Sequence, residues 1–221
     1  MGERKSSSAP VQCGDKRTRS ALSREKIVGQ AVDLIDATGV AELSMRKLGS
    51  ALGFEAMALY RHYPNKAALL SGVAESLYRE IISPDPGDPD WKAQVRAFAY
   101  SVRRAAQRHP RVFPLLVSAG HTHSAAEGIL WALSAVLKSA GFDEQAAHRA
   151  LLVLGGYVMG ATMWEIAALS GGGEPISGLP KPSRLGQCRP RPLEGENRDE
   201  LFQFGLEVLL DGLQARLDHK A

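Results

Sequence analysis

Apolar side chains recur every three or four residues along most of this chain, the spacing that gathers them on one face of an α-helix. Four such stretches in the first third of the sequence predict helices over residues 24–38, 45–52, 55–63 and 66–82. After the turn-rich run SPDPGDPD, the periodicity predicts five more, over residues 91–108, 111–117, 124–140, 144–169 and 197–219. No alternating strand pattern of any length is present, so the predicted fold class is all-α, with about nine to ten helices.

Short polar residues, glycine and proline mark the helix ends in the first third of the chain. Ser23, Ser44 and Asn65 each precede an apolar stretch and can cap a helix by accepting a hydrogen bond from its first amides. Gly53 can adopt the left-handed conformation that ends a helix, and Pro64 cannot continue one. Two short helices joined by a glycine turn and followed by a third helix are the arrangement of a helix-turn-helix.

In a helix-turn-helix, the second short helix enters the major groove of DNA, and basic residues near it neutralise phosphates. We expect Arg46, Arg61 and Lys66 to anchor phosphates and residues 56–60 to face the groove. The candidate DNA-contacting residues are Ser44, Met45, Arg46, Glu55, Ala56, Met57, Ala58, Leu59, Tyr60, Arg61, His62 and Lys66. Leu59 also suits the core, and the small and apolar members could be surface without contacts. A helix-turn-helix that serves only as a packing unit is the alternative.

Positive charge is concentrated at this end of the chain. Residues 1–66 contain 11 Lys and Arg and 7 Asp and Glu, a net charge of +4, whereas the remainder contains 16 and 17, a net charge of −1. The surplus therefore lies where a phosphate backbone would be bound. Residues 1–22 are polar, basic and rich in Ser, and we expect them to form a flexible arm that either follows DNA phosphates or makes no contact.

The run LSREKIVGQAVDLIDATGVAELSMRKLGSALGFEAMALYRHYPNKAALL, within residues 22–82, resembles the DNA-binding domain of the tetracycline-repressor (TetR) family of bacterial regulators. The resemblance covers three helices and the start of a fourth without a gap, and LYRHYPNK with the apolar helix after it is the most specific part. It implies that residues 23–82 form a DNA-binding domain of this family. Residues 90–221 would then form a C-terminal domain for ligand binding and dimerisation.

Two later stretches resemble the C-terminal domain of the tetracycline-repressor type. ALLVLGGYVMGATMWE is similar to its long eighth helix, and FGLEVLLDGL is similar to its final helix. In that family, these two helices from each subunit form the four-helix bundle of the dimer. Glycine inside a helix costs about 1 kcal/mol relative to alanine, which close approach of a second helix would compensate. The expected interface residues are Gly155, Gly156, Gly160, Leu206, Leu209, Leu210 and Leu213, with packing inside one subunit as the alternative.

The resemblance also bears on the ligand. In the tetracycline repressor itself, the drug is bound as a magnesium chelate by a His, a Thr and a Glu, and the positions aligned with them by eye here are Ser118, His121 and Trp164. Magnesium needs oxygen ligands, which Trp164 cannot supply, so we do not expect tetracycline as the effector. We expect instead an apolar and aromatic pocket. Its candidate residues, which are also ordinary core types, are Phe98, Val102, Phe113, His121, Trp131, Tyr157 and Trp164.

Other kinds of site are not indicated. The two histidines of His121-Thr122-His123 do not share a helix face, and zinc needs three or four ligands, so we expect neither a metal site nor a cofactor. Cys13 and Cys188 lie in segments that we expect to be flexible, the second in a loop over 171–196, which favours a reducing cytoplasm without a structural disulfide. No uninterrupted apolar run reaches the roughly 18 residues of a membrane span. No nucleophile motif, phosphate-binding loop or paired carboxylates indicate an enzyme.

These features predict a dimeric DNA-binding transcriptional regulator. The resemblance implies a repressor that covers a palindromic operator and is released by a small apolar or aromatic molecule. The ligand can shift the equilibrium only by its difference in affinity for two arrangements of the DNA-binding ends, and the helix over 66–82 would link those ends to the pocket. An activator, or a regulator without a ligand whose core only dimerises, is the alternative hypothesis.

Overall fold

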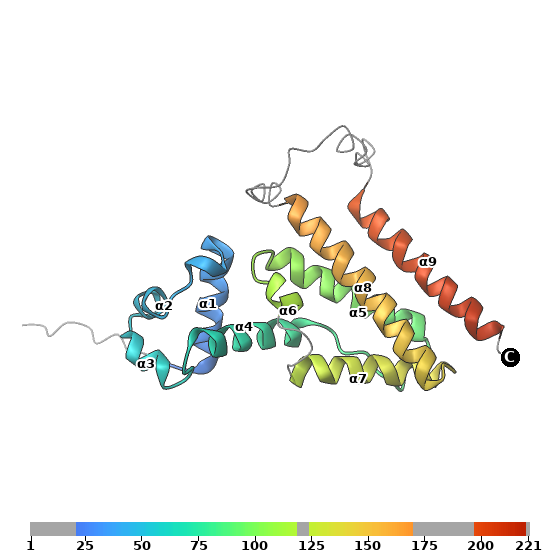
Figure 1. Cartoon of the computed structure of the whole chain (residues 1–221), viewed down its shortest axis with the longest axis horizontal. Coiled ribbons are helices and arrows are strands. Elements are labelled where there is room, and N and C mark those ends of the chain that lie inside the picture. The colour runs from blue at the N-terminus through green and yellow to red at the C-terminus, as the bar shows by residue number, and fades with distance from the viewer. Residues whose placement is uncertain (1–20, 119–123, 170–196, 220–221) are drawn as a thin grey trace, which may run out of the picture.

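The computed structural model describes residues 21–118, 124–169 and 197–219. Within these residues the chain forms nine α-helices, one short 3₁₀ helix and no strand, which confirms the predicted all-α fold (Figure 1). The elements are α1 (Arg24–Thr38), the 3₁₀ helix (Val40–Glu42), α2 (Met45–Leu52), α3 (Ala56–Tyr60), α4 (Lys66–Glu80), α5 (Trp91–Arg108), α6 (Pro114–Ser118), α7 (Ser124–Ser139), α8 (Glu144–Leu169) and α9 (Arg198–Asp218).

Helices α1 to α3 form a small head at one end of the molecule, and their ends are fixed by the residues that the sequence indicates. The Ser23 hydroxyl accepts a hydrogen bond from the Lys26 amide, and the Ser44 hydroxyl accepts one from the Lys47 amide. Gly53 ends α2 with a φ of 73°, a left-handed conformation that favours glycine. The helix-turn-helix is therefore set by local sequence signals.

Some helix ends differ from the prediction. Helix α3 stops at Tyr60, three residues earlier than expected, because the amides of His62 and Tyr63 both turn back to the carbonyl of Leu59. Pro64 follows, and it disfavours helical backbone at the residue before it. Helix α4 ends two residues earlier than predicted and α6 begins three residues later, and the 3₁₀ helix before α2 was not predicted.

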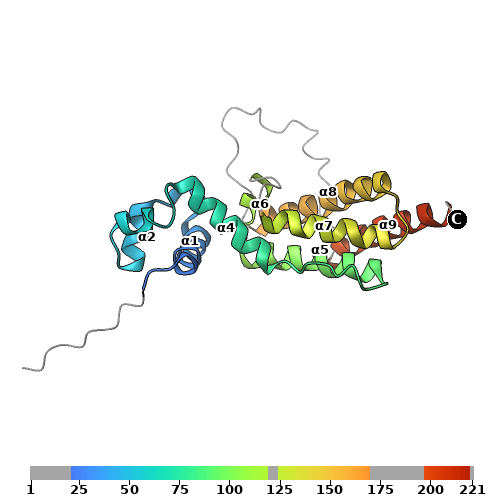
Figure 2. The same ribbon diagram turned by 90° about the horizontal axis from the view of Figure 1, so that it is seen from below.

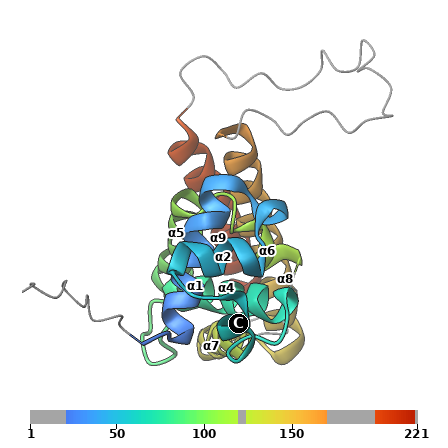
Figure 3. The same cartoon turned by 90° about the vertical axis from the view of Figure 1, so that its left-hand side faces the viewer.

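Helix α4 joins the head to the core. Its first half packs against α1, and other parts of the same helix contact α5, α6 and α7 (Figure 2). Helix α8 packs against α5 and α7 on one side and against α9 on another. Viewed from the head, α8 and α9 lie side by side beyond it (Figure 3). One connected cluster of buried apolar side chains runs through both parts, from Ile27 in α1 to Leu210 in α9.

Several predictions fall outside the described residues. They concern the arm, of which residues 1–20 are not described, the loop over 171–196 with Cys188, and His121 with its neighbours. The side chain of Ser118 is likewise not described.

Candidate nucleic-acid interface

The two short helices of the head approach each other closely at Gly49. A Cβ atom added to Gly49 would lie 2.7 Å from the backbone oxygen of Phe54 and 3.2 Å from the amide nitrogen of Ala56. These are backbone atoms, which cannot move aside as a side chain can. Gly49 therefore lets α3 sit against α2, and this contact sets the angle at which α3 is presented.

Most of the predicted DNA-contacting residues lie on the outside of the head. Arg46, Glu55, Met57, Tyr60 and Arg61 are exposed, and Met57 reaches 69% exposure. Ser44, Ala56, Ala58 and His62 are half-buried beside them. Within the described residues, neither Arg46 nor Arg61 has an ion pair or hydrogen bond from its guanidinium. An exposed short helix in a head that also carries two exposed arginines is suited to contact a groove and its phosphates.

Three of the predicted contacts are wrong. Met45 and Leu59 are buried in the head, with exposures of 7% and 0%, because they lie on the inner faces of α2 and α3. Lys66 is half-buried, and its ammonium donates a hydrogen bond of 3.1 Å to the carbonyl of Val40. Its charge therefore holds the unpredicted 3₁₀ helix to the start of α4 and is not directed to solvent.

A second candidate interface lies on the outer face of α8 and α9. Both helices carry large apolar side chains that are exposed in the single chain. On α8 these are Leu152, Val153 and Trp164, and on α9 they are Leu201, Phe204 and Val208. On α9 the residues are spaced by three and four, and on α8 Trp164 lies eleven and twelve positions after the adjacent Val153 and Leu152, so each helix carries its exposed apolar residues on one side. A contiguous apolar surface of this kind is characteristic of a protein interface; we call it the α8–α9 face.

The sequence predicted an interface on these two helices, but the structure leaves only some of the predicted residues exposed. Leu206 and Leu210 are wholly buried inside the subunit, so the prediction that they meet a partner is wrong, while Leu209 and Leu213 are half-buried. Helix α9 has apolar stripes on both sides, and periodicity alone does not say which stripe faces inward. The exposed residue that was missed most clearly is Phe204.

The three predicted interface glycines agree with this face. Gly156 and Gly160 are exposed on α8, and Gly155 is half-buried. A Cβ atom added to any of them would have no neighbour within 4 Å in the single chain. Contacts among the described residues therefore do not account for the cost of these glycines to the helix, and the close approach of a second helix stays a prediction.

Helix α8 is also unusual in composition. Over Glu144–Ala167 it is long and apolar enough to cross a membrane, judged by length and composition alone, and only 28% of the apolar window is buried inside the chain. Its inner side nevertheless packs against α5, α7 and α9. The low burial reflects the exposed stripe of the α8–α9 face.

From the middle of α8 to its C-terminal end, α8 and α9 are closely joined. A Cβ atom on Gly205 would lie 2.3 Å from the hydroxyl oxygen of Tyr157, and that hydroxyl donates a 2.8 Å hydrogen bond to the carbonyl of Phe202. Arg103 of α5, which is 5% exposed, donates two hydrogen bonds of 2.6 and 2.9 Å to Glu165. Its Nη2 atom also lies 2.5 Å from Asp199 of α9.

The predicted ligand-pocket residues do not form one group. Trp131 and Trp164 are 71% and 79% exposed on the surface of the subunit, so the prediction that they line an interior pocket of one chain is wrong. Val102 and Phe113 are buried in the core, and Phe98 is half-buried against it. Tyr157 serves as the contact between α8 and α9. Helical periodicity does not indicate which aromatic residues face outward, because exposed and buried ones occupy similar helical patterns.

The head meets the core through polar contacts. Nδ1 of His109, at the end of α5, lies 2.6 Å from a carboxylate oxygen of Asp36 in α1. Arg108 pairs with Glu80 of α4 at 2.7 Å, and Arg111 donates a 2.6 Å hydrogen bond to the carbonyl of Ala37. The angle of the head is therefore fixed by contacts of α1 and α4 with the segment that follows α5.

Comparison with family models places both parts of the chain. Residues 27–73 match the model for bacterial regulatory proteins of the tetR family. Residues 83–217 match the model for the tetracyclin repressor-like C-terminal domain.

Curated relatives agree with these matches. The chain is 30% identical over 207 residues to the class A tetracycline repressor protein of transposon 1721 from Escherichia coli, covering 88% of this chain and 92% of the relative. It is 32% identical over 152 residues to an HTH-type transcriptional regulator of Saccharopolyspora erythraea, covering 67% of this chain. That match spans 63% of the length of the regulator. The HTH-type transcriptional repressor DrrR1 of Streptomyces coeruleorubidus is 29% identical, over 65% of this chain and 53% of the relative.

Solved structures have the same architecture. A possible TetR family transcriptional regulator from Streptomyces coelicolor A3(2) superposes with a TM-score of 0.71 and 29% identity, over 87% of this chain and 99% of the other. BioQ bound to its double-stranded DNA operator superposes with a TM-score of 0.64 and 25% identity, over 88% and 99%. Another solved crystal structure of BioQ is of the protein from Mycobacterium smegmatis.

Proposed function

The chain belongs to the TetR family of bacterial transcriptional regulators, and from this membership we propose that it is a repressor that binds a palindromic operator as a dimer and is released by a small apolar or aromatic molecule. As a member of this family it is a regulator and not an enzyme. The observation that carries the proposal is the exposed helix α3, with Arg61 directly after it and Arg46 in the first turn of α2, both exposed and, within the described residues, without an ion pair.

The head supports DNA binding through its chemistry. Arg46 precedes the glycine turn and Arg61 follows α3, so their guanidinium groups can bind phosphates on either side of a groove that α3 enters. Met57 and Tyr60 are the large exposed side chains of α3 and would contact base edges and sugars. The solved complex of BioQ with its operator is a precedent for DNA binding by this fold.

The α8–α9 face supports the dimer. A second copy of this face would cover the apolar stripe of each subunit and bring α8 close to another helix at Gly156 and Gly160. A two-fold dimer presents two heads, which match half-sites about one turn of DNA apart on a palindrome. The interface residues that we now propose are Leu152, Val153, Gly156, Gly160, Leu201, Phe204 and Val208.

The proposed effector site remains in the core, around Phe98, Val102 and Phe113. These residues are apolar and aromatic, which favours an effector of the same character. Helix α4 contacts α1 in the head and α5, α6 and α7 in the core, so a ligand that changes the packing of the core would also move the head. The polar contacts of His109 and Arg111 with α1 offer a second connection between the two parts.

Enrichment of bound fragments from random and genomic DNA by the full chain, followed by sequencing, tests the proposal. A palindrome with half-sites about one turn apart supports a dimeric operator-binding protein. Failure to enrich any sequence at low salt would contradict it. A reporter gene placed behind the recovered site then distinguishes repression from activation, which is the alternative function.

A regulator without a ligand is the second alternative. Thermal unfolding of the full chain against a panel of apolar metabolites and drugs addresses it, because a ligand that binds the folded state raises Tm. A compound that raises Tm and also releases the operator supports the effector proposal. Compounds that raise Tm without changing operator affinity would favour a core that only dimerises.

A further inference from the structure

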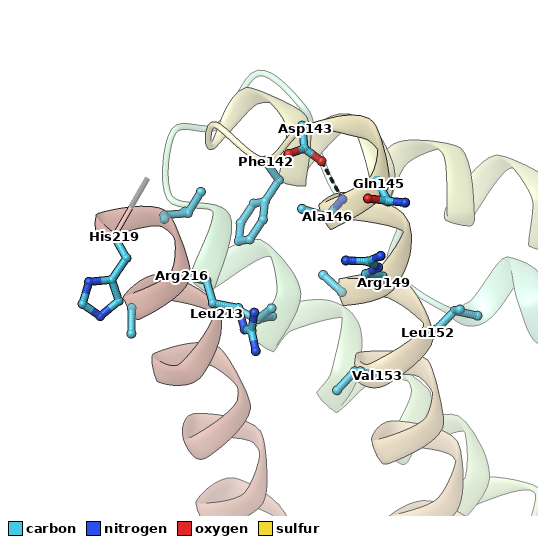
Figure 4. Close-up of a pocket in the computed structure, with 13 residues that line it drawn as sticks. Phe142, Asp143, Gln145, Ala146, Arg149, Leu152, Val153, Leu213, Arg216 and His219 are labelled. Carbon is cyan, nitrogen blue, oxygen red and sulfur yellow. Dashed lines mark hydrogen bonds between the residues drawn. The ribbon is translucent and has the colours of Figure 1, made fainter. Parts of the chain in front are cut away.

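A cleft of about 950 Å³ opens between the first turns of α8 and the last turns of α9, at the end of the core remote from the head (Figure 4). Its floor is apolar and includes Phe142, Leu213 and Leu217. The volume falls within the range of about 300–1,000 Å³ found for small-molecule sites. The lining of the cleft does not include Phe98, Val102 or Phe113, the residues of the effector site proposed above.

Two guanidinium groups face this cleft from opposite walls. Arg149 comes from α8 and Arg216 from α9, and both side chains point into the gap between the helices (Figure 4). Within the described part of the chain, neither guanidinium takes part in an ion pair or a hydrogen bond. The acidic lining residue Asp143 is occupied by the cap of α8, where it accepts a 2.8 Å hydrogen bond from the Ala146 amide.

Three basic residues of α5 that lie against α9 are neutralised. Lys92, Arg96 and Arg103, all on α5, form ion pairs with acidic residues of α9, at 3.0, 2.6 and 2.5 Å. Pairs inside the subunit satisfy these three cations, whereas the two arginines of the cleft are available to an anion from outside. Two guanidinium groups over an apolar floor select a ligand with an acidic head and an apolar body.

We propose that this cleft binds a small organic anion, an aryl or alkyl carboxylate or sulfonate, with its acidic group between Arg149 and Arg216 and its apolar part on Phe142 and Leu217. The lip of the cleft includes Leu152 and Val153, which also belong to the α8–α9 face. The anion would therefore sit at the edge of the proposed subunit interface. A carboxylate of a second subunit is the competing occupant of the cleft. The experiment below distinguishes it from a small organic anion.

Fluorescence titration of the full chain with 8-anilinonaphthalene-1-sulfonate tests the proposal, since this probe combines aromatic rings with one sulfonate. We expect the double variant Arg149→Gln/Arg216→Gln to bind the probe about tenfold more weakly, the effect of losing charge-assisted hydrogen bonds. The matched control Arg104→Gln/Arg198→Gln changes two exposed arginines outside the cleft and should bind the probe as the unmodified protein does. N-phenyl-1-naphthylamine, which has the rings without the charge, should bind both variants alike.

Two outcomes would overturn the proposal. Equal affinity of the unmodified protein and the Arg149→Gln/Arg216→Gln variant for the sulfonate would mean that the probe binds an apolar surface alone. Dissociation of the dimer in proportion to probe binding, followed by sedimentation, would mean that a second subunit normally fills the cleft. Neither readout involves DNA, so the cleft proposal can fail while operator binding succeeds, and the reverse.

Discussion

The head and the α8–α9 face both expose large apolar side chains, but they do so in different settings. In the head, Met57 and Tyr60 lie on one short helix, and the unpaired Arg46 and Arg61 lie nearby. On α8 and α9, the exposed apolar residues form two long neighbouring stripes that include glycines. The setting distinguishes the partners, since arginines beside a short helix suit the phosphates of DNA and a broad uncharged stripe suits another apolar surface.

The two surfaces also differ in how the subunit holds them. The head depends on one close backbone approach at Gly49, where α3 sits against α2. The α8–α9 layer is held by buried charges at one end, around Arg103, and leaves an open cleft at the other. Changes in the first surface should therefore alter DNA binding alone, whereas changes in the second should alter assembly and, through it, DNA binding.

The largest effect should come from a charge placed on the α8–α9 face. We expect Val208→Asp to weaken dimerisation about a hundredfold or more, because the interface would bury an unpaired carboxylate. Operator affinity should fall with it, since two unlinked heads lose the benefit of binding together. Sedimentation and DNA titration measure both effects. Gln203→Asp, about 140° around the same helix, is the matched control and should remain dimeric; a dimeric Val208→Asp protein would contradict the proposed face.

The head should be most sensitive at Gly49. We expect Gly49→Ala to destabilise the head by about 1–3 kcal/mol, because the added methyl group meets backbone atoms that cannot move without separating α2 from α3. The variant should have a lower Tm and a weaker affinity for the operator, while it remains a dimer. Gly29→Ala on α1, where an added Cβ has no neighbour within 4 Å, should be neutral or stabilising. Equal behaviour of the two variants would show that the close approach is unimportant.

Arg61 should affect DNA binding alone. We expect Arg61→Ala to weaken operator binding about tenfold and to make the salt dependence shallower by about one released counterion per head. The dimer and its Tm should not change. Arg104→Ala, an exposed arginine of the core, provides the control at the same loss of net charge. If both variants lower affinity equally, Arg61 acts only through net charge and is not a contact.

The smallest effect should be a change in acid stability at the end of the core that holds Arg103. Burial would raise the pKa of Glu165, but hydrogen bonds from Arg103 and Gln107 outweigh it, so its pKa lies below the ordinary value. A lowered pKa stabilises the fold above the ordinary carboxyl range and loses that contribution as the pH falls through the lowered value. We expect Glu165→Gln to remove this contribution, so that stability falls less steeply as the pH drops below the ordinary carboxyl range. Glu200→Gln, on the exposed side of α9, should leave the pH profile of Tm unchanged, and a profile unaltered by Glu165→Gln would remove Glu165 from the acid response.

Local signals explain why the head could be predicted from the sequence. The caps at Ser23 and Ser44 and the left-handed turn at Gly53 act within a few residues, so their outcome does not depend on distant parts of the chain. The errors there, at Met45, Leu59 and Lys66, arise from long-range packing. In particular, the hydrogen bond from Lys66 to Val40 joins residues 26 positions apart.

The core was harder to predict because its helices are apolar on more than one side. Leu206 and Val208 are two positions apart on α9, and one is buried while the other is exposed. Nothing in the local sequence decides which stripe meets α8 and which is left for a partner. The outward position of Trp164 has the same origin, since its helix carries apolar residues around much of its circumference. The choice is made by the packing of α5, α7 and α9 against α8.

The central claim, that two heads on one dimer read one operator, is tested most directly by the mass of the protein bound to the DNA that it selects. We expect selection to recover a palindrome and the complex at saturation to contain an even number of chains per site, with Val208→Asp giving weak, single-chain binding to half-sites. A saturated complex of one chain on a site without symmetry would contradict the claim. So would full operator affinity in a protein that Val208→Asp has made monomeric.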